Sequence, residues 1–317
     1  MKRFDVTLAG EITVDFLMYG LPEELPVERE LLATGMALTL GGSSAITAHN
    51  LAALGSKIGF IPQLADDVFT ELCLRSLKDA GVDFEKAVAP KNGIGTGVTV
   101  MLQHEIRRRA LTYSGTISGL RYEDLDLDYL ASGRHFHLSS FFLQSGLRDD
   151  VPKLLSKMRA AGLTTSMDTN DDPEDAWQGP IAETLRELDI LMPNEREVCR
   201  LASEQDFELA LSKLAKIVPT LVVKRGAKGA IAVHRGERYS VAGIPTEVVD
   251  VIGAGDSFNA GFLHAFVNGH EIVECLRMGN ICGAYSTIAN GGTVAFRNRT
   301  RMREFMEQHC AKLASAH

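Results

Sequence analysis

The chain has 317 residues, 45% of them hydrophobic, which is enough for one large core or two domains. Its 41 acidic residues outnumber its 33 basic ones, and the formal net charge is -8. This balance argues against nucleic-acid binding and against a polybasic membrane contact. A small anionic substrate stays compatible with it, because a local cationic pocket can form on an acidic protein.

The amino-terminal residues lack an apolar stretch long enough for a signal peptide. No uninterrupted apolar run reaches the roughly 18 residues that a membrane helix needs. The five cysteines, Cys73, Cys199, Cys275, Cys282 and Cys310, have no paired spacing of the kind that binds metal. We therefore expect reduced thiols in a cytoplasmic protein.

Along the chain, short apolar runs alternate with amphipathic helices. The runs that predict strands are FDVTLAG at 4–10, KIGFIP at 57–62, FHLSS at 136–140, LTTSMD at 163–168, DILMP at 189–193 and TLVVKRG at 220–226. Helical stretches at 67–81 and 151–162 each close on a glycine. Strands alternating with helices predict an α/β fold with a parallel sheet covered on both faces.

Two segments interrupt this alternation, residues 13–40 and 94–117. The first is rich in glycine and proline, and the second reads TGVTVMLQ followed by RRRALTYSG, as a hairpin would. The two segments could pair as a small sheet that closes over a site as a lid. The alternative is two surface excursions with no shared role. The predicted division is a core of residues 1–12, 41–93 and 118–317, and a lid of residues 13–40 and 94–117.

The segment LGGSSAITAHNLAALG at 40–55 contains a glycine pair, Gly41 and Gly42. Ser43 and Ser44 follow, and we expect them to cap a helix that begins near Ala45. The small residues permit either a close approach of backbone to ligand or simply a tight turn with close packing.

The segment EVVDVIGAGDSFNAGFLHAFVNG at 247–269 is the most informative. A strand-like run leads through Gly253, Ala254 and Gly255 to Asp256, which lies in the first turn of a predicted helix. Free backbone N–H groups and the helix dipole favour an anion at such a junction. A carboxylate there suits deprotonation of an attacking hydroxyl, although it could instead only stabilise its own helix. The chain lacks GxxxxGK[ST], so this is not a P-loop.

These two glycine motifs together resemble the signatures of the ribokinase-like, or PfkB-type, carbohydrate kinases. In the same order as in that family, PNERE at 193–197 resembles its N-x-x-E pattern and KRGAKG at 224–229 its nucleotide-binding loop. GEITVDF at 10–16 resembles the first strand entering the lid. The resemblance covers most of the chain and implies a mostly parallel central sheet between helices, with a small β-sheet lid. It also implies a homodimer formed through the lid.

The resemblance implies ATP and Mg2+ as cofactors and a role for each matching residue. Asp256 would be the catalytic base, and the backbone of Gly253, Ala254 and Gly255 would stabilise the transferring phosphoryl group. The other implied sites are Asn194 and Glu197 for Mg2+, reached through water; Lys224, Gly226 and Gly229 for the nucleotide; and Asp15, Gly41, Gly42 and Arg109 for the substrate. Asp168 and Asn170, in SMDTN, are further candidates near the phosphates or the sugar.

The chain departs from the family pattern in two places. Ile46 stands where many members carry a polar residue that contacts the sugar. Val251 and Ile252 replace threonines that follow the first aspartate of the signature, Asp250 here. Many members bind a monovalent cation such as K+ near that aspartate. With the threonines replaced, the sequence does not decide whether this chain binds one.

Other candidate residues have ordinary explanations. His135 and His137 alternate on one face of a predicted strand without an evident third metal ligand, so we expect core or cleft histidines. The run Arg107, Arg108 and Arg109 is an ordinary charged turn or, inside the lid, a source of one substrate contact; alternation would place Arg107 and Arg109 on one face. The predicted function is phosphorylation of a hydroxyl on a sugar. A nucleoside kinase and a 2-keto-3-deoxy sugar-acid kinase stay as alternatives, while the intact motifs oppose a non-catalytic sugar-binding regulator.

Overall fold

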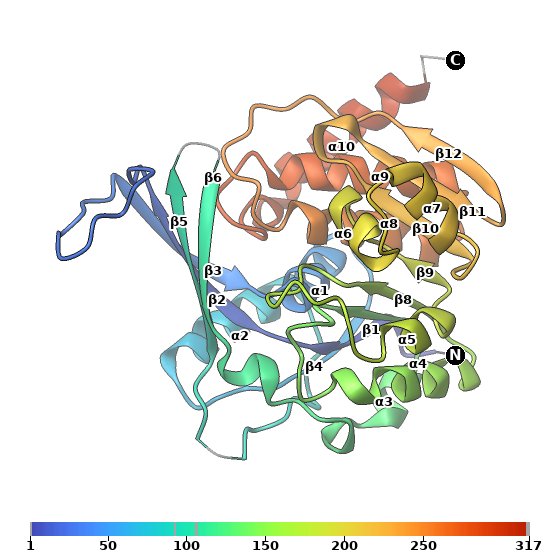
Figure 1. Cartoon of the computed structure of the whole chain (residues 1–317), viewed down its shortest axis with the longest axis horizontal. Helices are drawn as coiled ribbons and strands as arrows, with labels where there is room; N and C mark the ends of the chain where they lie inside the picture. The colour runs from blue at the N-terminus through green and yellow to red at the C-terminus, as the bar shows by residue number, and fades with distance from the viewer. Residues whose placement is uncertain (1, 92, 105–106, 315–317) are drawn as a thin grey trace.

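A computed structural model describes residues 2–91, 93–104 and 107–314. Eight strands form the main sheet in the order β12-β11-β10-β9-β8-β7-β1-β4 (Figure 1). Their bounds are β1 Phe4–Gly10, β4 Ile58–Pro62, β7 Gly133–Ser139, β8 Thr164–Asp168, β9 Ile190–Leu191, β10 Thr220–Lys224, β11 Ala230–His234 and β12 Glu237–Val241. The pairs from β4 to β10 are parallel, and β11 and β12 continue the sheet in antiparallel pairing.

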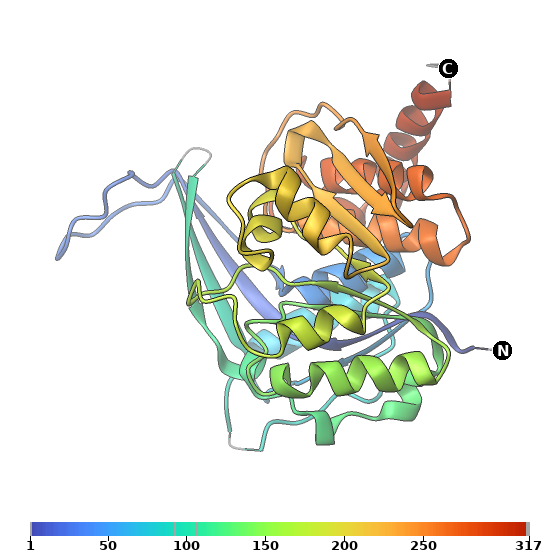
Figure 2. The ribbon, with the colours of Figure 1, turned by 45° about the vertical axis from the view of Figure 1, so that its right-hand side comes forward.

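Helices cover both faces of this sheet (Figure 2), because the strands are apolar on both sides. On one face lie α3 Leu127–Ala131, α4 Val151–Ala160, α5 Ile181–Arg186, α6 Glu195–Leu201 and α7 Phe207–Leu214. On the other lie α1 Ser43–Ala53, α2 Val68–Ala80, α8 Ala254–Val267 and α9 Ile272–Ser286. The last helix, α10 Arg299–Ala314, packs beside α9.

A second sheet of four strands, in the order β3-β2-β5-β6, stands beside the main body. Its strands are β2 Thr13–Tyr19, β3 Gly35–Gly41, β5 Gly97–His104 and β6 Arg107–Tyr113. They come from the two segments that we named as the lid, and we keep that name for this sheet. The division of the chain into two domains at those boundaries stays a prediction.

The predicted α/β class, a mostly parallel sheet between helices with a small second sheet, agrees with the observed sheet order. Each predicted strand is found, and the helix at 67–81 ends at Gly81 in the left-handed conformation, as its glycine predicts. Among the described residues, no helix combines the length and apolarity that crossing a membrane requires.

Candidate active site

The glycine-led start of α8 forms an open helix terminus. Gly253 has a φ of 70°, which favours glycine, and a Cβ there would collide with Gly292. No side chain among the described residues caps the helix. The Ala254 N–H donates to the Val251 carbonyl at 3.3 Å, whereas the Gly255 and Asp256 N–H groups find no partner among the described residues. Two unsatisfied donors at the positive end of a helix make a site for an anion.

Asp256 lies in the first turn of this helix with only 8% of its surface exposed. Burial raises the pKa of its carboxyl to about 7, and the charge of Asp168 acts in the same direction. Lys224 and a hydrogen bond with Ser43 act against this rise. A carboxyl that titrates near neutral pH suits a general base.

Lys224 ends β10, and its ammonium is paired with the Asp168 carboxylate at the end of β8. Burial alone would lower the pKa of Lys224, but Asp168 and Glu197 outweigh it and raise that pKa. Asn259 of α8 donates to the same Asp168 oxygen at 2.6 Å. A Cβ built on Gly255 would lie 3.5 Å from the Lys224 Nζ, so a buried positive charge stands beside the open start of α8.

Asn194 and Glu197 lie at the start of α6, where each side chain accepts a backbone N–H of the other in a capping box. Burial and the neighbouring Asp168 raise the pKa of Glu197 to about 7. Close to them, the buried Asn259 Oδ1 has no hydrogen-bond partner among the described residues. Acidic oxygens held in a buried cluster, with an unsatisfied oxygen beside them, fit a hard divalent cation such as Mg2+.

Asp15 projects from β2 of the lid and is 5% exposed. Burial raises the pKa of its carboxyl to about 7, and the charge of Asp256 contributes to the rise. Gly41 pairs with Thr13 on the neighbouring strand, and a Cβ on Gly41 would occupy the space of the Asp15 carboxylate. Gly41 is therefore required for close packing against Asp15, and an approach of its backbone to a ligand stays a prediction. The lid thus places one buried carboxyl within electrostatic range of another in the core.

The start of α1 differs from the prediction. The helix begins at Ser43 with Gly42 as its N-cap, and the cap is supplied by Glu11 rather than by the serines. Glu11 accepts the Ser44 N–H at 3.1 Å and the Ser44 hydroxyl at 2.6 Å, and it also accepts the Ser140 hydroxyl. The reason is that Glu11 ends the turn after β1 with only 3% of its surface exposed, so its carboxylate needs donors.

Ser43 connects two of the predicted site residues. The Asn170 amide donates to the Ser43 oxygen, so the single Ser43 proton is free to point elsewhere. Ser43 also lies close to the Asp256 carboxylate, and its hydroxyl lowers the pKa of Asp256. One turn later, Thr47 donates to the Asp256 carbonyl at 3.5 Å. The two glycine-led helices are thereby tied together at the position of Asp256.

Asp250 is 4% exposed and already has three donors. Its Oδ1 accepts the Ile252 N–H at 2.9 Å, and its Oδ2 accepts the Gly291 N–H at 2.9 Å and the Tyr19 hydroxyl at 3.3 Å. The carboxylate therefore anchors the loop before α8 to the lid. A monovalent cation at this position stays a prediction.

The predicted nucleotide loop follows Lys224 directly. Gly226 begins a single 3-10 turn with a φ of 54°, and Gly229 ends it with a φ of 92°. A Cβ on Gly229 would collide with the Val241 carbonyl, whereas one on Gly226 would meet open space. Gly229 is thus needed for the turn between β10 and β11, and Gly226 leaves its surroundings free for a ligand.

The strand pairing contradicts the placement of Arg109 on the substrate side. Asp15 lies opposite Thr99, which lies opposite Thr112, so these three share one face of the lid. Alternation along β6 puts Arg108 on that face and Arg109 on the other. The charge of Arg108 also acts on Asp15 and lowers its pKa. The alternation of side chains was predictable from the sequence, but which of the two faces carries Asp15 was not. The Arg107 side chain lies outside the described part.

The two strand histidines are core residues. His135 and His137 are fully buried and both hydrogen-bond the Ser166 hydroxyl at 2.7 Å. Burial lowers the pKa of each to about 3. Within the described residues, no group of three or more His, Cys, Asp or Glu side chains could hold a metal ion. Cys73, Cys199 and Cys275 are free thiols in the described part of the chain, and the Cys310 side chain lies outside that part.

Three contributors were missed in the sequence: Glu11, Asn259 and Tyr19. Glu11 follows a buried strand, where an open parallel sheet collects polar ligands, and that position could have identified it. Asn259 lies one turn into α8, facing Asp168, and only the packed structure reveals that.

Comparisons with known proteins agree with this geometry. Residues 5–298 match the model of the pfkB family carbohydrate kinases. A 5-dehydro-2-deoxygluconokinase of Geobacillus kaustophilus is 28% identical over 97% of this chain and 95% of its own length. A fructokinase of Escherichia coli is 28% identical over 83% of this chain and 90% of its own. A solved structure of a candidate ribokinase II from Escherichia coli superposes with a TM-score of 0.85 at 25% identity, covering 96% of this chain and 100% of the other. A second structure of a candidate ribokinase II from that organism contains ATP and Mg2+; it covers 96% of this chain and 100% of the other, with a TM-score of 0.82 at 24% identity.

Proposed function

Because this chain belongs to the pfkB family of carbohydrate kinases and is therefore a phosphotransferase, we propose that it transfers the terminal phosphoryl group of ATP to a hydroxyl of a monosaccharide. Asp256 is the general base of this proposal. The observation that carries it is a buried carboxyl, with its pKa raised to about 7, in the first turn of a helix whose start is open to an anion. Phosphoryl transfer needs these two features side by side.

In the proposed reaction, Asp256 takes the proton of the acceptor hydroxyl as that oxygen attacks phosphorus. The backbone N–H groups at the start of α8 stabilise the negative charge on the transferring group; Gly255 carries an open donor there, with Gly253 shaping the turn. Lys224 adds a positive charge beside the same position. Charge stabilisation of this kind, in a buried site, is the main contribution that a protein makes to such a transfer.

Asn194 and Glu197 are proposed to hold Mg2+ through water. The ion, when bound there, would offset the negative charge of the ATP phosphates. The acidic cluster with Asp168 supports this assignment, since a cation favours the ionised form of a carboxyl whose pKa burial has raised. Gly226 and Gly229 are proposed to border the nucleotide, because they follow Lys224 at the same edge of the main sheet.

The acceptor is proposed to bind between the lid and the start of α1. Asp15 lies within electrostatic range of Asp256, and Gly41 and Gly42 leave the backbone beside it without side chains. Asn170 stands at its border through its bond to Ser43. A carboxylate and an amide are suited to hydroxyl groups of a sugar, since they supply acceptors and donors together.

An ADP-release assay tests the proposal directly. The purified chain is incubated with Mg-ATP and, separately, with ribose, fructose, a 2-keto-3-deoxy sugar acid and nucleosides. We expect ADP release that depends on a monosaccharide, and none in the absence of an acceptor beyond slow hydrolysis. Release with nucleosides alone would contradict the proposed substrate class.

A sugar acid is the second candidate, and one observation favours it. Arg108 extends from the face of the lid that carries Asp15, and a guanidinium there can bind a carboxylate with two hydrogen bonds. The similarity to a 5-dehydro-2-deoxygluconokinase points in the same direction. A kcat/KM at least about tenfold higher for a sugar acid than for neutral sugars would select this candidate.

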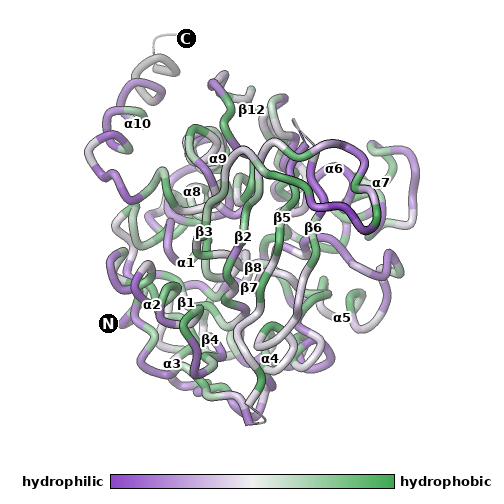
Figure 3. The backbone as a smooth tube through the Cα atoms, turned by 90° about the vertical axis from the view of Figure 1, so that its left-hand side faces the viewer, coloured by the Kyte–Doolittle hydropathy of each residue, from purple (hydrophilic) through white to green (hydrophobic). Residues whose placement is uncertain are grey.

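The homodimer is proposed to form through the outer face of the lid. Alternation puts Met36, Leu111 and Tyr113 on the face opposite Asp15, where their exposed fractions are 62%, 60% and 58%. Phe16 and Val100 share that face, and Figure 3 shows the apolar stretches of these strands side by side. An apolar sheet face of this kind is typical of an interface. A monomer mass in light scattering at micromolar concentration would contradict the dimer.

A further inference from the structure

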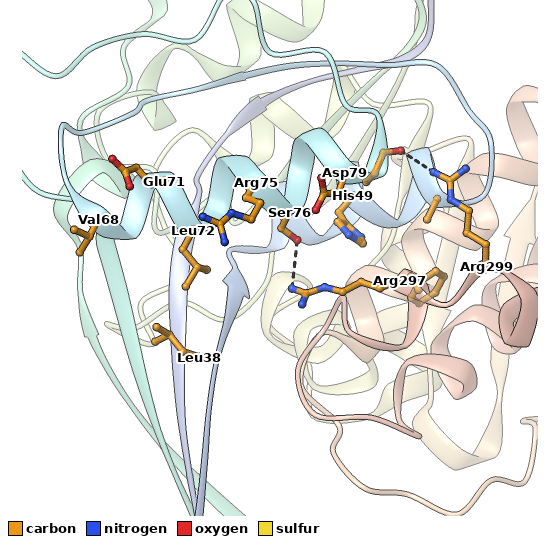
Figure 4. A pocket seen from close by; sticks show the side chains of 13 residues that line it. Leu38, His49, Val68, Glu71, Leu72, Arg75, Ser76, Asp79, Arg297 and Arg299 are labelled. Atoms are coloured by element: carbon orange, nitrogen blue, oxygen red, sulfur yellow. Dashed lines mark hydrogen bonds between the residues drawn. The ribbon is translucent and has the colours of Figure 1, made fainter.

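A cavity of about 530 Å³ lies between α1, α2 and the segment that leads into α10 (Figure 4). Residues from all three contribute to its wall, and none of the residues assigned above to catalysis or to ligand binding borders it. Its volume falls in the range of cavities that bind small molecules. The cavity is therefore a second space in the molecule for which the proposed reaction has no use.

Three arginines border the cavity: Arg75 of α2, and Arg297 and Arg299 on the opposite side. None of them forms an ion pair with a carboxylate in the described part of the chain. The Arg297 guanidinium donates to the Ser76 hydroxyl at 3.5 Å, and that of Arg299 donates to the Ala80 carbonyl at 3.1 Å. Two acidic residues, Glu71 and Asp79, border the same space, so the wall keeps an excess of positive charge. Unpaired guanidiniums around a cavity favour an anion.

His49 of α1 contributes an acceptor to the same wall. Its side chain is only 2% exposed, and its Nδ1 lies 2.8 Å from the Asn50 Oδ1. The Asn50 amide nitrogen donates to the Gly292 carbonyl, which can only accept, and this fixes the Asn50 oxygen toward His49. The His49 Nδ1 therefore carries the proton of the neutral ring, and Nε2 is left as a bare acceptor. Burial lowers the pKa of His49 to about 4, so the ring is neutral at pH 7.

The same hydrogen bonds lead from the cavity to the start of α8. Asn50 donates to the Ser257 hydroxyl at 2.9 Å and to the Gly292 carbonyl at 2.9 Å. Ser257 follows Asp256 and donates to the Gly253 carbonyl at 2.7 Å. A ligand that contacts His49 is thus one residue away from a side chain that holds the proposed anion site in place.

We propose that this cavity is an effector site for a small phosphorylated hydroxy compound, such as a sugar phosphate, and that its occupancy is coupled to the active site through Asn50. The phosphate contacts Arg75 and Arg297, and a hydroxyl donates to the His49 Nε2. Only the coupling rests on the proposed kinase function; the binding does not. The compound has the chemistry of the kinase product or of a compound formed from it, so the site would report on the level of phosphorylated sugar.

Binding is tested by calorimetry with fructose 1-phosphate, fructose 6-phosphate and inorganic phosphate as probes. We expect a sugar phosphate to bind the parent chain and to bind Arg75→Ala at least about tenfold more weakly, because a charge-assisted contact is lost. Arg297→Ala is the second variant and is expected to show the same loss. Arg303→Ala, an exposed arginine of α10 outside the cavity, is the matched control. Equal affinity of the parent chain and both variants for every probe would overturn the proposal. Binding of the probes at the active site alone would produce such equal affinities.

Coupling is tested by measuring kcat and KM for the acceptor with and without the bound sugar phosphate. We expect at least about a fivefold change in the parent chain and none in Arg75→Ala, while Arg75→Ala keeps the basal rate. Simple product inhibition at the active site would be equal in both chains and would overturn the coupling. If the chain phosphorylated no sugar, the calorimetric result would still stand, so the two proposals fail separately.

Discussion

The two glycine-led helices, α1 and α8, begin with the same backbone conformation but differ in the charge at their amino-terminal ends. Gly42 before α1 and Gly253 before α8 both have a positive φ, of 86° and 70°. At α1, however, the buried carboxylate of Glu11 accepts a first-turn N–H and a hydroxyl. At α8 no side chain of the described chain caps the helix. A glycine-led start is therefore an anion site only where the protein has not filled it with an acid of its own.

We propose that this difference gives the two helix starts different roles. The start of α1, already neutralised by Glu11, is proposed to present Gly41 and Gly42 to acceptor hydroxyls. The start of α8 is proposed to keep its positive potential for the phosphoryl group. Asp256 stands at the junction because Ser43 of α1 bonds its side chain. Each of the following predictions alters one side of this comparison.

Asp256→Asn should have the largest effect. It removes the base and keeps the shape and the helix start, so we expect kcat to fall by about 10^2–10^4-fold with near-native folding. Steady-state ADP release and circular dichroism check the two parts. A rate within a factor of about 3 of the parent would remove Asp256 from the role of base.

Glycine-to-alanine changes at the starts of α8 and α1 should have different effects, one on the rate and the other on stability. In Gly255→Ala the new methyl meets only ordinary contacts, the nearest being the Lys224 Nζ at 3.5 Å, so the fold should persist. The methyl enters the space beside the anion site, and we expect kcat to fall by about 10^2-fold. In Gly42→Ala the positive φ and a contact at 3.1 Å with the Glu11 carbonyl should cost about 1–3 kcal/mol of stability. The test measures the thermal unfolding and the kcat of both variants. A loss of stability in Gly255→Ala and a loss of rate with unchanged stability in Gly42→Ala would contradict the different roles of the two helix starts.

Arg108→Ala and Arg109→Ala test which face of the lid meets the acceptor. Arg108 shares the face of Asp15, so its loss should raise the KM for the acceptor about tenfold and the KM for ATP little. Arg109→Ala is the matched control from the adjacent position on the outer face and should change neither constant. An effect of Arg109→Ala alone would show that the acceptor contacts the face of the lid opposite Asp15. A larger effect of Arg108→Ala on a sugar acid than on a neutral sugar would sharpen the choice of substrate.

Ser43→Ala should have the smallest effect, and a pH-dependent one. The base must be ionised, so the rate should rise as pH increases through about 7, the pKa of Asp256. The Ser43 hydroxyl stabilises the ionised form, and removing it should move this rise to higher pH. We expect about a fivefold to tenfold loss below pH 7 that shrinks above it. A loss of equal size at every pH would mean that Ser43 only packs, and Ser43→Thr should restore the parent profile.

Much of this candidate site could be predicted from the sequence because its residues lie in short contiguous motifs. The glycines, Asp256 and the PNERE segment each lie at the end of a strand or the start of a helix, and parallel strands bring such ends to one edge of a sheet. That side chains alternate between two faces along a strand at 107–113 was equally predictable. Which face of β6 meets the cleft was not, because that depends on the pairing of Asp15 with Thr99 and of Thr99 with Thr112.

Other features depended on burial, which a single sequence does not display. The position of Glu11 after a predicted strand was visible, but its burial and its bond to the Ser44 N–H, which keep the start of α1 from being an anion site, were not. The pairing of Lys224 with Asp168 joins residues 56 positions apart in the chain. The cavity bordered by Arg75 and Arg297 joins residues from opposite ends of the sequence, and no motif marks it.

The most direct test of the comparison is a crystal structure of the chain with Mg2+, ADP, fluoroaluminate and the accepted sugar. The fluoroaluminate imitates the transferring phosphoryl group. We expect it at the start of α8, bonded to the Gly255 N–H, with the acceptor hydroxyl within about 3 Å of the Asp256 carboxylate. Fluoroaluminate at the start of α1, or an acceptor hydroxyl beyond hydrogen-bond reach of Asp256, would contradict the division of roles between the two helices.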